Sequence, residues 1–476
     1  MHNTFYITTT LPYVNADPHI GFALELVQAD IIARHRRLSG TEVFFNTGTD
    51  EHGVKIYRKA LEEGREPQAY VDEYAEKFRN LKAPLGLSDD LHFIRTTDPR
   101  HIEAAQEFWR RCATSGDIYK KQYRIKYCIG CELEKTESEL TEGKCPIHPA
   151  TPLEVREEEN YFFKLSKYQS QLLALYETQK DFVVPDFRLN EIRSLIKEKG
   201  LEDFSISRLK SKMPWGVPVP DDNEQVMYVW FDALVNYVST LGWPSDEVNF
   251  KKWWPVVQFA GKDQVRQQAV MWQAMLMSAG LPSSRQIVIH GFITSGGEKM
   301  SKSLGNVVDP CALVREYGTD PLRYYLARHI NPFEDSDFTM EKFTEAYNAD
   351  LANGLGNLVS RIMKMAADNL TGAVSVPPQT IPQDFLDAMN AYHIQAAASI
   401  VSETIASLDR RIQETQPFKL VKAEPQKGKE IITELTVGLY TVARMLNPIL
   451  PETSEKIKEL VKANNMPSEP LFPRRT

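Results

Sequence analysis

The chain has 476 residues, of which 42% are hydrophobic and 25% charged, and its formal net charge at pH 7 is −8. This composition predicts a globular protein of about two to four structural units and excludes a disordered or fibrous one. No run of about 18 apolar residues occurs, and no basic segment precedes an apolar one at the start, so we expect a cytoplasmic protein without membrane contact. Five cysteines in this length argue against a disulfide framework. Because the chain is acidic, any nucleic-acid partner must be held by local basic patches.

The first residues predict a strand, a loop and a helix. Residues 5–10, FYITTT, are aromatic and β-branched, which favours a strand. Asp17 suits the N-cap of the following helix, and Pro18 suits its first position. His19 and Gly21 would then lie in the first turn, where free N–H groups and the helix dipole favour an anion. This order of elements is typical of a dinucleotide-type α/β unit.

A lysine-bearing loop follows another apolar run. Residues 286–289, QIVI, predict a buried parallel strand, and the Ser-Gly-Gly of 295–297 then gives the backbone unusual freedom. Lys299 and Lys302 follow within the run KMSKS. A loop that moves through its glycines and carries two ammonium groups can close over a polyphosphate and stabilise negative charge that develops in a transition state. A solvated surface loop is the alternative that composition alone leaves open.

Three of the five cysteines are clustered. Cys128 and Cys131 form a Cys-x2-Cys pair, and Cys145 and His148 form a Cys-x2-His pair. Each pair makes a tight turn that presents two ligands at tetrahedral spacing, and thiolates and imidazole are the ligands that structural zinc prefers. The sequence therefore predicts one closed zinc site, without an open position for chemistry.

The rest of the chain predicts an interrupted α/β sheet followed by helices. Residues 55–111 are expected to be helical with breaks at Gly64 and at residues 84–86, and residues 226–233 are expected to resume a strand. Beyond residue 309 the apolar stripes have helical spacing. The expected fold class is α/β, with a Rossmann-type parallel sheet, a zinc-knuckle insertion and a terminal all-α helical bundle.

Six spaced motifs and a histidine turn carry a family resemblance. In chain order they are LPY at 11–13, PHIG at 18–21, GTDEHG at 48–53, the knuckle, YVWFDA at 228–233, GKD at 261–263 and KMSKS at 299–303. With them, nearly the whole chain resembles the bacterial-type methionyl-tRNA synthetases, which belong to the class I aminoacyl-tRNA synthetases. The resemblance implies ATP-dependent attachment of methionine to tRNA(Met), initiator and elongator, through a methionyl-adenylate, with release of AMP and pyrophosphate.

The same resemblance implies site residues and cofactors. The methionine site would comprise Leu11, Tyr13, Asp50, Trp230, Tyr237 and Gln268. The ATP site, with Mg²⁺, would comprise His19, Gly21, Gly261, Asp263, Lys299 and Lys302, of which His19, Gly21, Lys299 and Lys302 would serve catalysis. The anticodon would be read by Asn357, Arg361 and Phe418, and one structural Zn²⁺ would be held by Cys128, Cys131, Cys145 and His148. Three residues depart from the family pattern, because Phe22 and Gln268 stand where histidines are usual and Phe418 where a tryptophan is.

The resemblance also implies a division of the chain. We expect the first half of the Rossmann catalytic domain at 1–114, a connective insertion with the knuckle at 115–225, the second half at 226–295, the lysine loop and stem-contact linker at 296–345, and a helical anticodon-binding domain at 346–476. Because the chain ends soon after the bundle, a monomer is expected. Two alternatives stay open: a cysteinyl-type synthetase, which would place zinc at the amino acid, and a catalytically inactive zinc-containing tRNA-binding protein, for which Phe22 is the best evidence.

Overall fold

The structure is a computed structural model that describes residues 4–131, 133–135, 140–300, 306–372, 374–376 and 381–475. It divides into two units. Unit 1 comprises Met1–Pro18, Thr41–Asn80 and Asp90–Ile289, and unit 2 comprises His19–Gly40, Leu81–Asp89 and His290–Thr476. Within the described ranges, no helix has the length and apolar character needed to cross a membrane.

Unit 1 is built on a six-stranded sheet with the order β3-β2-β1-β12-β13-β7. Its strands are β1 (Thr4–Thr8), β2 (Glu42–Thr49), β3 (His92–Arg95), β7 (Val183–Val184), β12 (Val256–Gly261) and β13 (Gln286–His290). β1 pairs in parallel with both β2 and β12, so the strand order reverses between β1 and β12. In open α/β sheets such a reversal is where ligands bind, outside the carboxyl ends of the strands. The expected Rossmann-type parallel sheet is confirmed.

Helices of unit 1 surround a large apolar core. They are α2 (Val54–Glu62), α3 (Pro67–Arg79), α4 (Pro99–Thr114), α5 (Gln169–Thr178), α6 (Asp186–Lys199), α7 (Val229–Ala233), α8 (Asn236–Ser239), α9 (Glu247–Trp253) and α10 (Trp272–Ser278), with 3-10 turns at Leu165–Tyr168 and Lys262–Gln264 and a π-helix at Arg266–Met271. Phe108 of α4 stacks on Trp272 of α10 with ring centroids 5.4 Å apart. Aromatic pairs of this kind add to the stability that comes from burial alone.

Two expectations for unit 1 are wrong. The stretch expected to be helical from 55 to 111 contains the strand β3, which is too short to show a period of its own and is held by its pairing with β2. The strand expected at 226–233 ends at Met227, and helix α7 begins at Val229. A short apolar run does not distinguish a buried strand from a buried helix, so the fold decides.

The inserted segment of unit 1 forms two antiparallel sheets. The larger has the order β5-β4-β6-β8 and the smaller β10-β11-β9. Their strands are β4 (Ile118–Cys128), β5 (Leu133–Lys135), β6 (Glu154–Phe163), β8 (Phe204–Ser205), β9 (Ser207–Leu209), β10 (Pro218–Val219) and β11 (Asp222–Met227). β4 and β6 form a long ladder that runs from Ile118↔Phe163 to Tyr127↔Glu154. The ladder therefore ends beside Cys128, the first cysteine of the cluster.

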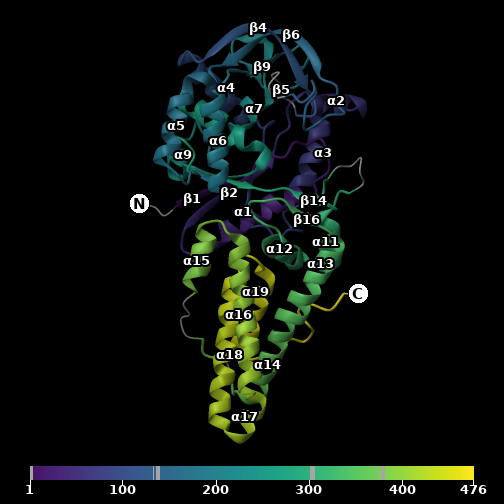
Figure 1. The fold of residues 1–476 in the computed structure, drawn as a ribbon, viewed down its shortest axis with the longest axis vertical. Helices are drawn as coiled ribbons and strands as arrows, with labels where there is room; N and C mark the ends of the chain where they lie inside the picture. Colours follow the sequence, from purple (N-terminus) through teal and green to yellow (C-terminus); the bar gives the residue numbers. More distant parts are fainter. Residues whose placement is uncertain are drawn as a thin grey trace. The chain divides into compact units, whose positions relative to one another are not determined.

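Unit 2 is mostly helical. Its helices are α1 (Ile20–Leu38), α11 (Pro310–Tyr317), α12 (Thr319–Arg328), α13 (Met340–Ala346), a π-helix at Tyr347–Gly356, α14 (Asn357–Asn369), α15 (Gln383–Asn390), α16 (Ile394–Thr415), α17 (Pro417–Ala423), α18 (Pro425–Leu446) and α19 (Pro451–Ala463). A small sheet, β15-β14-β16, joins β14 (Ile293–Ser295), β15 (Glu298–Lys299) and β16 (Ser336–Phe338). Helices α14, α16 and α18 run side by side as the expected bundle (Figure 1).

A buried arginine joins four segments of unit 2. Arg323 of α12 is fully buried, and its NH2 lies 2.8 Å from Oδ2 of Asp30 on α1. The same guanidinium donates to the carbonyls of Leu85, Pro448 and Ile449 at 2.9 to 3.0 Å. Because a buried charge is tolerated only when it is paired and hydrogen-bonded, this arginine fixes how α1 and α12 pack.

Candidate active site and metal centre

In unit 1 the loops that follow β1 and β2 are hydrogen-bonded to one another. Tyr13 and Asp50 form an isolated parallel bridge. The backbone N–H of Asp50 donates to the Pro12 carbonyl at 3.0 Å, and that of Val14 donates to the Asp50 carbonyl at 3.2 Å. These contacts bring Tyr13 and Asp50, both predicted for the methionine site, to the carboxyl ends of adjacent strands. The Asp50 residue is 7% exposed.

The next residue, Glu51, anchors this loop. Its carboxylate is fully buried and accepts from Arg95 twice, Nε to Oε1 at 2.7 Å and NH2 to Oε2 at 2.8 Å. Thr49 and Thr97 hydroxyls donate to the same carboxylate. Although burial opposes it, pairing with Glu51 raises the pKa of Arg95, so this guanidinium stays charged. Bidentate pairs are directional, and this one fixes the backbone beside Asp50.

His52 ties the loop to helix α7. Its Nδ1 lies 2.9 Å from Oδ2 of Asp232, and Nε2 of His101 lies 3.5 Å from the other Asp232 oxygen. Burial favours the neutral acid, but His52 and His101 outweigh it and hold the pKa of Asp232 below its usual value. Asp232 is two residues beyond Trp230, so the cluster connects two predicted parts of the methionine site. Sequence reasoning missed the partners of Glu51 and His52, although both residues stand in the GTDEHG motif.

The remaining predicted methionine residues lie on short helices of unit 1. Trp230 belongs to α7, and Tyr237 belongs to α8, where its carbonyl accepts from the Tyr6 hydroxyl at 3.0 Å. Gln268 lies in the π-helix Arg266–Met271, and its Oε1 accepts from Gln258 Nε2 at 2.7 Å. Its amide N–H₂ donates to Gln264 Oε1 at 3.4 Å, and a histidine can also act as a donor. Leu11 lies in the loop between β1 and the bridge at Tyr13.

Two residues predicted for ATP follow β12. Gly261 is its last residue, and Asp263 lies exposed in the following 3-10 turn. They thus stand at the carboxyl end of the strand that pairs with β1, at the reversal of strand order. This is the position at which a Rossmann-type sheet binds a nucleotide.

In unit 2, helix α1 begins at Ile20, and His19 is its N-cap. The expected N-cap at Asp17 is therefore wrong: His19 Nδ1 accepts from the Gly21 N–H at 3.0 Å and supplies the capping acceptor itself. A Cβ at Gly21 would lie 2.8 Å from His19 Cε1, so this ring position requires glycine. Phe22 packs its ring against His19 with centroids 4.4 Å apart. The departure at Phe22 thus replaces a donor with an aromatic support for His19.

The lysine loop starts from a hairpin. β14 and β15 are joined through Gly296 and Gly297, whose φ angles are +65° and +80°, as the Ser-Gly-Gly sequence predicts. Asp337 stabilises the turn, because its Oδ1 accepts hydrogen bonds from the Gly297 N–H at 2.8 Å and from Thr294 Oγ1 at 3.1 Å. The Gly297 N–H is also the main cause of the lowered pKa of Asp337. Lys299 ends β15 and only its backbone is described; Lys302 lies outside the described residues.

The cysteine cluster of unit 1 has the geometry of a metal centre. The ligand atoms of Cys128, Cys131, Cys145 and His148 all lie within 4.8 Å of one another. Cys131 Sγ is 3.4 Å from Cys145 Sγ and 3.2 Å from His148 Nδ1. Tetrahedral zinc would place two sulfurs about 3.7 Å apart, whereas a disulfide would need about 2 Å. The donor set fits one zinc ion, and no other residue that the structure describes adds a ligand atom to the cluster.

The predicted anticodon residues separate into two places. Asn357 and Arg361 of α14 line one cavity of unit 2 with a volume of about 330 Å³. Arg361 also pairs with Asp409 of α16. Phe418 lies on α17 and is 45% exposed, and it is not among the residues that line that cavity.

Comparison with known proteins agrees with this geometry. A family model described as tRNA synthetases class I (M) matches residues 5–151 and 131–363. A methionine–tRNA ligase of Thermosynechococcus vestitus is 46% identical over 95% of this chain and 89% of its own, and one of Thermotoga maritima is 42% identical over 98% and 76%. A structure of Mycobacterium tuberculosis methionyl-tRNA synthetase in complex with methionyl-adenylate covers 100% of both chains with 36% identity and a TM-score of 0.91. The chain therefore belongs to the methionyl-tRNA synthetases of class I.

Proposed function

We propose that the chain attaches methionine to tRNA(Met), initiator and elongator, in two steps that use ATP. Methionyl-adenylate forms first with release of pyrophosphate, and a ribose hydroxyl of the tRNA then takes the methionyl group and releases AMP. The observation that carries the proposal is the full-length likeness to the mycobacterial structure that holds methionyl-adenylate. The relatives favour neither the cysteinyl-type alternative nor an inactive tRNA-binding protein.

For methionine, we assign the α-ammonium to the Asp50 carboxylate and the side chain to Leu11, Tyr13, Trp230, Tyr237 and Gln268. An ammonium needs a carboxylate, and a thioether needs aromatic walls with a donor near sulfur. The bridge between Tyr13 and Asp50 supports this assignment, because it holds two of these residues in one place. Glu51 and His52 act as positioning residues, since their buried partners hold the loop on both sides of Asp50.

For ATP, we assign the ribose to Gly261 and Asp263, and the phosphates to His19, Gly21, Lys299 and Lys302. These assignments rest on the family motifs and on the N-terminal position of His19 at α1. The methionine carboxylate attacks the α-phosphorus, and the lysines stabilise the departing pyrophosphate. When bound, Mg²⁺ neutralises phosphate charge. Catalysis is then chiefly positioning and charge stabilisation.

For the metal, we propose one structural Zn²⁺ held by Cys128, Cys131, Cys145 and His148. Burial opposes ionisation of Cys145, but hydrogen bonds from backbone N–H groups of His148 and Ile147 and from Cys131 lower its pKa, which favours the thiolate that a metal binds. Metal analysis of the dialysed protein should give one zinc per chain. A Cys145→Ser variant should retain less zinc, and an unchanged content would remove this residue from the ligand set.

For tRNA, we retain Asn357, Arg361 and Phe418 as anticodon readers within the helical segment 346–476. The shared cavity of Asn357 and Arg361 supports two of the three. Phe418 is exposed enough to stack on an unpaired base. A monomer stays a prediction, to be measured by light scattering of the purified chain.

The test of the activity is amino-acid-dependent exchange of pyrophosphate into ATP without tRNA, run with each amino acid in turn. Exchange with methionine alone is expected. Exchange with cysteine, or none from the folded zinc-loaded protein, would contradict the proposal. Lys302→Ala should slow exchange by about 100-fold or more, the effect of losing one well-placed donor, while methionine binding changes little.

A further inference from the structure

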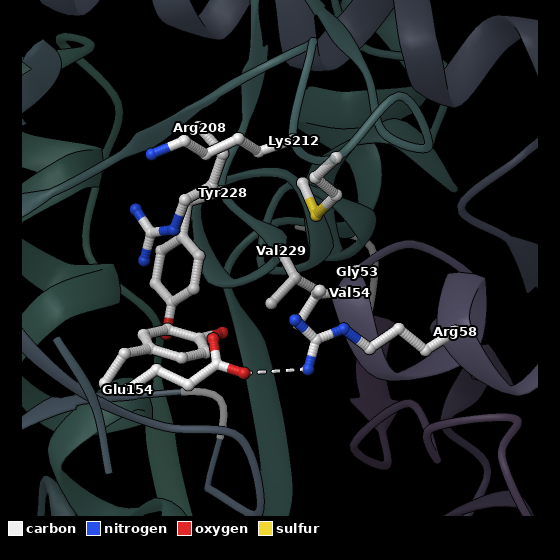
Figure 2. A pocket seen from close by; sticks show the side chains of 10 residues that line it. Gly53, Val54, Arg58, Glu154, Arg208, Lys212, Tyr228 and Val229 are labelled. Atoms are coloured by element: carbon white, nitrogen blue, oxygen red, sulfur yellow. Dashed lines mark hydrogen bonds and ion pairs between the residues drawn. The ribbon is translucent and has the colours of Figure 1, made fainter. Parts of the chain in front are cut away.

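A cavity of about 360 Å³ lies in unit 1 beside helix α2 and strands of the inserted sheets (Figure 2). Its lining residues come from five separate stretches of the chain and are Gly53, Val54, Arg58, Tyr127, Glu154, Arg208, Lys212, Met213, Tyr228 and Val229. Three of these side chains are cations and one is a carboxylate. In a chain whose net charge is −8, such a cavity is a local positive site.

The floor of the cavity is apolar. Val54, Tyr127 and Met213 belong to a small buried cluster that is separate from the main core, and Ile129 packs against it. Ile129 lies inside the Cys128–Cys131 turn, and Tyr127 immediately precedes that turn. The turn from Cys128 to Cys131 therefore packs against the apolar floor of the cavity through Ile129. An apolar floor under charged walls suits a ligand that has both a flat ring and anionic groups.

The cations differ in how firmly they are held. Arg208 is 4% exposed, its guanidinium lies 4.4 Å from the Tyr228 ring centroid, and its NH1 donates to Ser205 Oγ at 2.9 Å. Arg58 reaches toward Glu154, and Figure 2 shows the ion pair, with NH1 3.0 Å from Oε1. Lys212 is exposed at the cavity. The Arg208 guanidinium is thus buried against the Tyr228 ring, Arg58 is paired with a carboxylate, and Lys212 is exposed.

The cavity shares chain segments with the proposed methionine site. Gly53 is three residues beyond Asp50, and Val229 directly precedes Trp230. A ligand in the cavity would therefore contact residues whose neighbours in the chain are assigned to the methionyl group. The volume is near the lower end of the range for small-ligand pockets, about 300 to 1,000 Å³, which suits one nucleotide and excludes a duplex.

We propose that this cavity binds a nucleotide of the single-stranded 3′ end of the tRNA during transfer. Lys212 and Arg58 contact phosphate, and the base lies on the apolar floor at Met213, beside Tyr228. Single strands are held in this way, by cations along the backbone and by stacking of bases. Glu154 opposes the RNA and competes for Arg58. This inference rests on the proposed function and adds to it the place where the acceptor end is held.

The test compares Lys212→Gln with Lys210→Gln, because Lys210 is a nearby exposed lysine that is not a lining residue. The rate of methionyl transfer from preformed adenylate to subsaturating tRNA should fall about tenfold for Lys212→Gln and stay unchanged for Lys210→Gln. Pyrophosphate exchange without tRNA should not change in either variant. Losing one phosphate contact should also lower the slope of log Kd against log salt by about 0.7 for a single strand.

A second variant should change the rate of methionyl transfer in the opposite direction. Glu154→Gln removes the carboxylate that competes for Arg58, so transfer to subsaturating tRNA should become about two- to fivefold faster. A tRNA without its single-stranded 3′ end should bind the parent and Lys212→Gln equally. These gains and losses in opposite directions would not follow from a merely structural role.

Four results would overturn the inference: equal rates for the two lysine variants, a parallel loss of exchange and transfer, an affinity difference that persists with the trimmed tRNA, or inhibition of transfer by free AMP that Lys212→Gln relieves. The last result would assign the cavity to a free mononucleotide. A parent protein without methionine-dependent exchange would defeat the proposed function itself, which separates that failure from this one.

Discussion

Two buried aspartates, one in each unit, are satisfied to different degrees. In unit 2, Asp30 accepts from the Ser88 N–H and hydroxyl at 2.8 and 2.6 Å, and it pairs with Arg34 and Arg323 at 2.7 and 2.8 Å. In unit 1, Asp232 has one good partner, His52, whereas its second oxygen lies 3.5 Å from His101 and makes no hydrogen bond to any residue that the structure describes. Both residues are almost fully buried.

This difference indicates that Asp30 has a structural role, whereas Asp232 supports the candidate methionine site. A fully satisfied buried network fixes packing, and removing one partner leaves an uncompensated charge. A buried polar group without all its hydrogen bonds is costly, and such groups occur mainly beside functional residues, where the surrounding structure keeps them in place. We therefore expect Asp30 to matter mainly for stability, and Asp232 mainly for methionine binding through His52 and the loop of Asp50.

The largest effect is expected from Asp30→Asn. The substitution leaves the fully buried Arg323 without its carboxylate and should destabilise unit 2 by about 3 to 5 kcal/mol. Because unfolding of two units need not be one transition, the measurement is hydrogen exchange of peptides from α1, together with urea unfolding. A loss below about 1 kcal/mol would place Asp30 in the same class as a surface ion pair.

Asp232→Asn should weaken methionine binding more than it lowers stability. Loss of a hydrogen bond to a charged group, worth about 1.5 to 3 kcal/mol, should raise the KM for methionine in pyrophosphate exchange about tenfold or more. Asp203→Asn is the matched control, because its partners Ser166 and Tyr119 are not site residues. If Asp232→Asn lost as much stability as Asp30→Asn and its KM for methionine were unchanged, the two aspartates would have the same structural role, contrary to this prediction.

Lowering the pH should reduce the stability that the ionised carboxylates of Asp30 and Asp232 contribute, and the loss should be larger for Asp30. The pKa of Asp30 is lowered because Arg323 and Arg34 outweigh the effect of burial, and His52 and His101 do the same for Asp232. A carboxyl whose folded pKa is depressed adds stability above its ordinary value of 3.8, and this stability is lost as pH falls through the folded pKa. Stability measured against pH should therefore drop below about pH 4, and Asp30→Asn should flatten that drop more than Asp232→Asn.

The smallest effect is expected from Lys364→Ala. Lys364 pairs with Asp368 at 3.1 Å on α14, and the two side chains are 62% and 54% exposed. An exposed pair of this kind contributes about 0 to 1 kcal/mol. Thermal unfolding should therefore match the parent within that margin, which gives a baseline in unit 2 for Asp30→Asn. A loss of stability above about 1 kcal/mol would show that an exposed ion pair can also be important, so burial would not explain the difference between ion pairs.

The sequence predicted the features whose causes are local. The candidate metal ligands follow from two short-range pairs at Cys128 and Cys145, and the turn at Gly296 follows from glycine's tolerance of positive φ. The parallel sheet follows from short β-branched apolar runs and the order of strand, loop and helix, and the terminal bundle follows from apolar stripes at helical spacing. The order of motifs along the chain also predicted the family.

Tertiary structure alone decided the partners. Asp232 stands 180 residues from His52, and Asp30 stands 293 residues from Arg323, so no local pattern couples them. It also placed the helix start at Ile20, because the imidazole of His19 caps α1 where Asp17 was expected to. The cavity near Arg58 arises from five separate stretches of chain. Burial and pairing are properties of the folded chain, because a side chain's environment is set by segments that only the fold brings together.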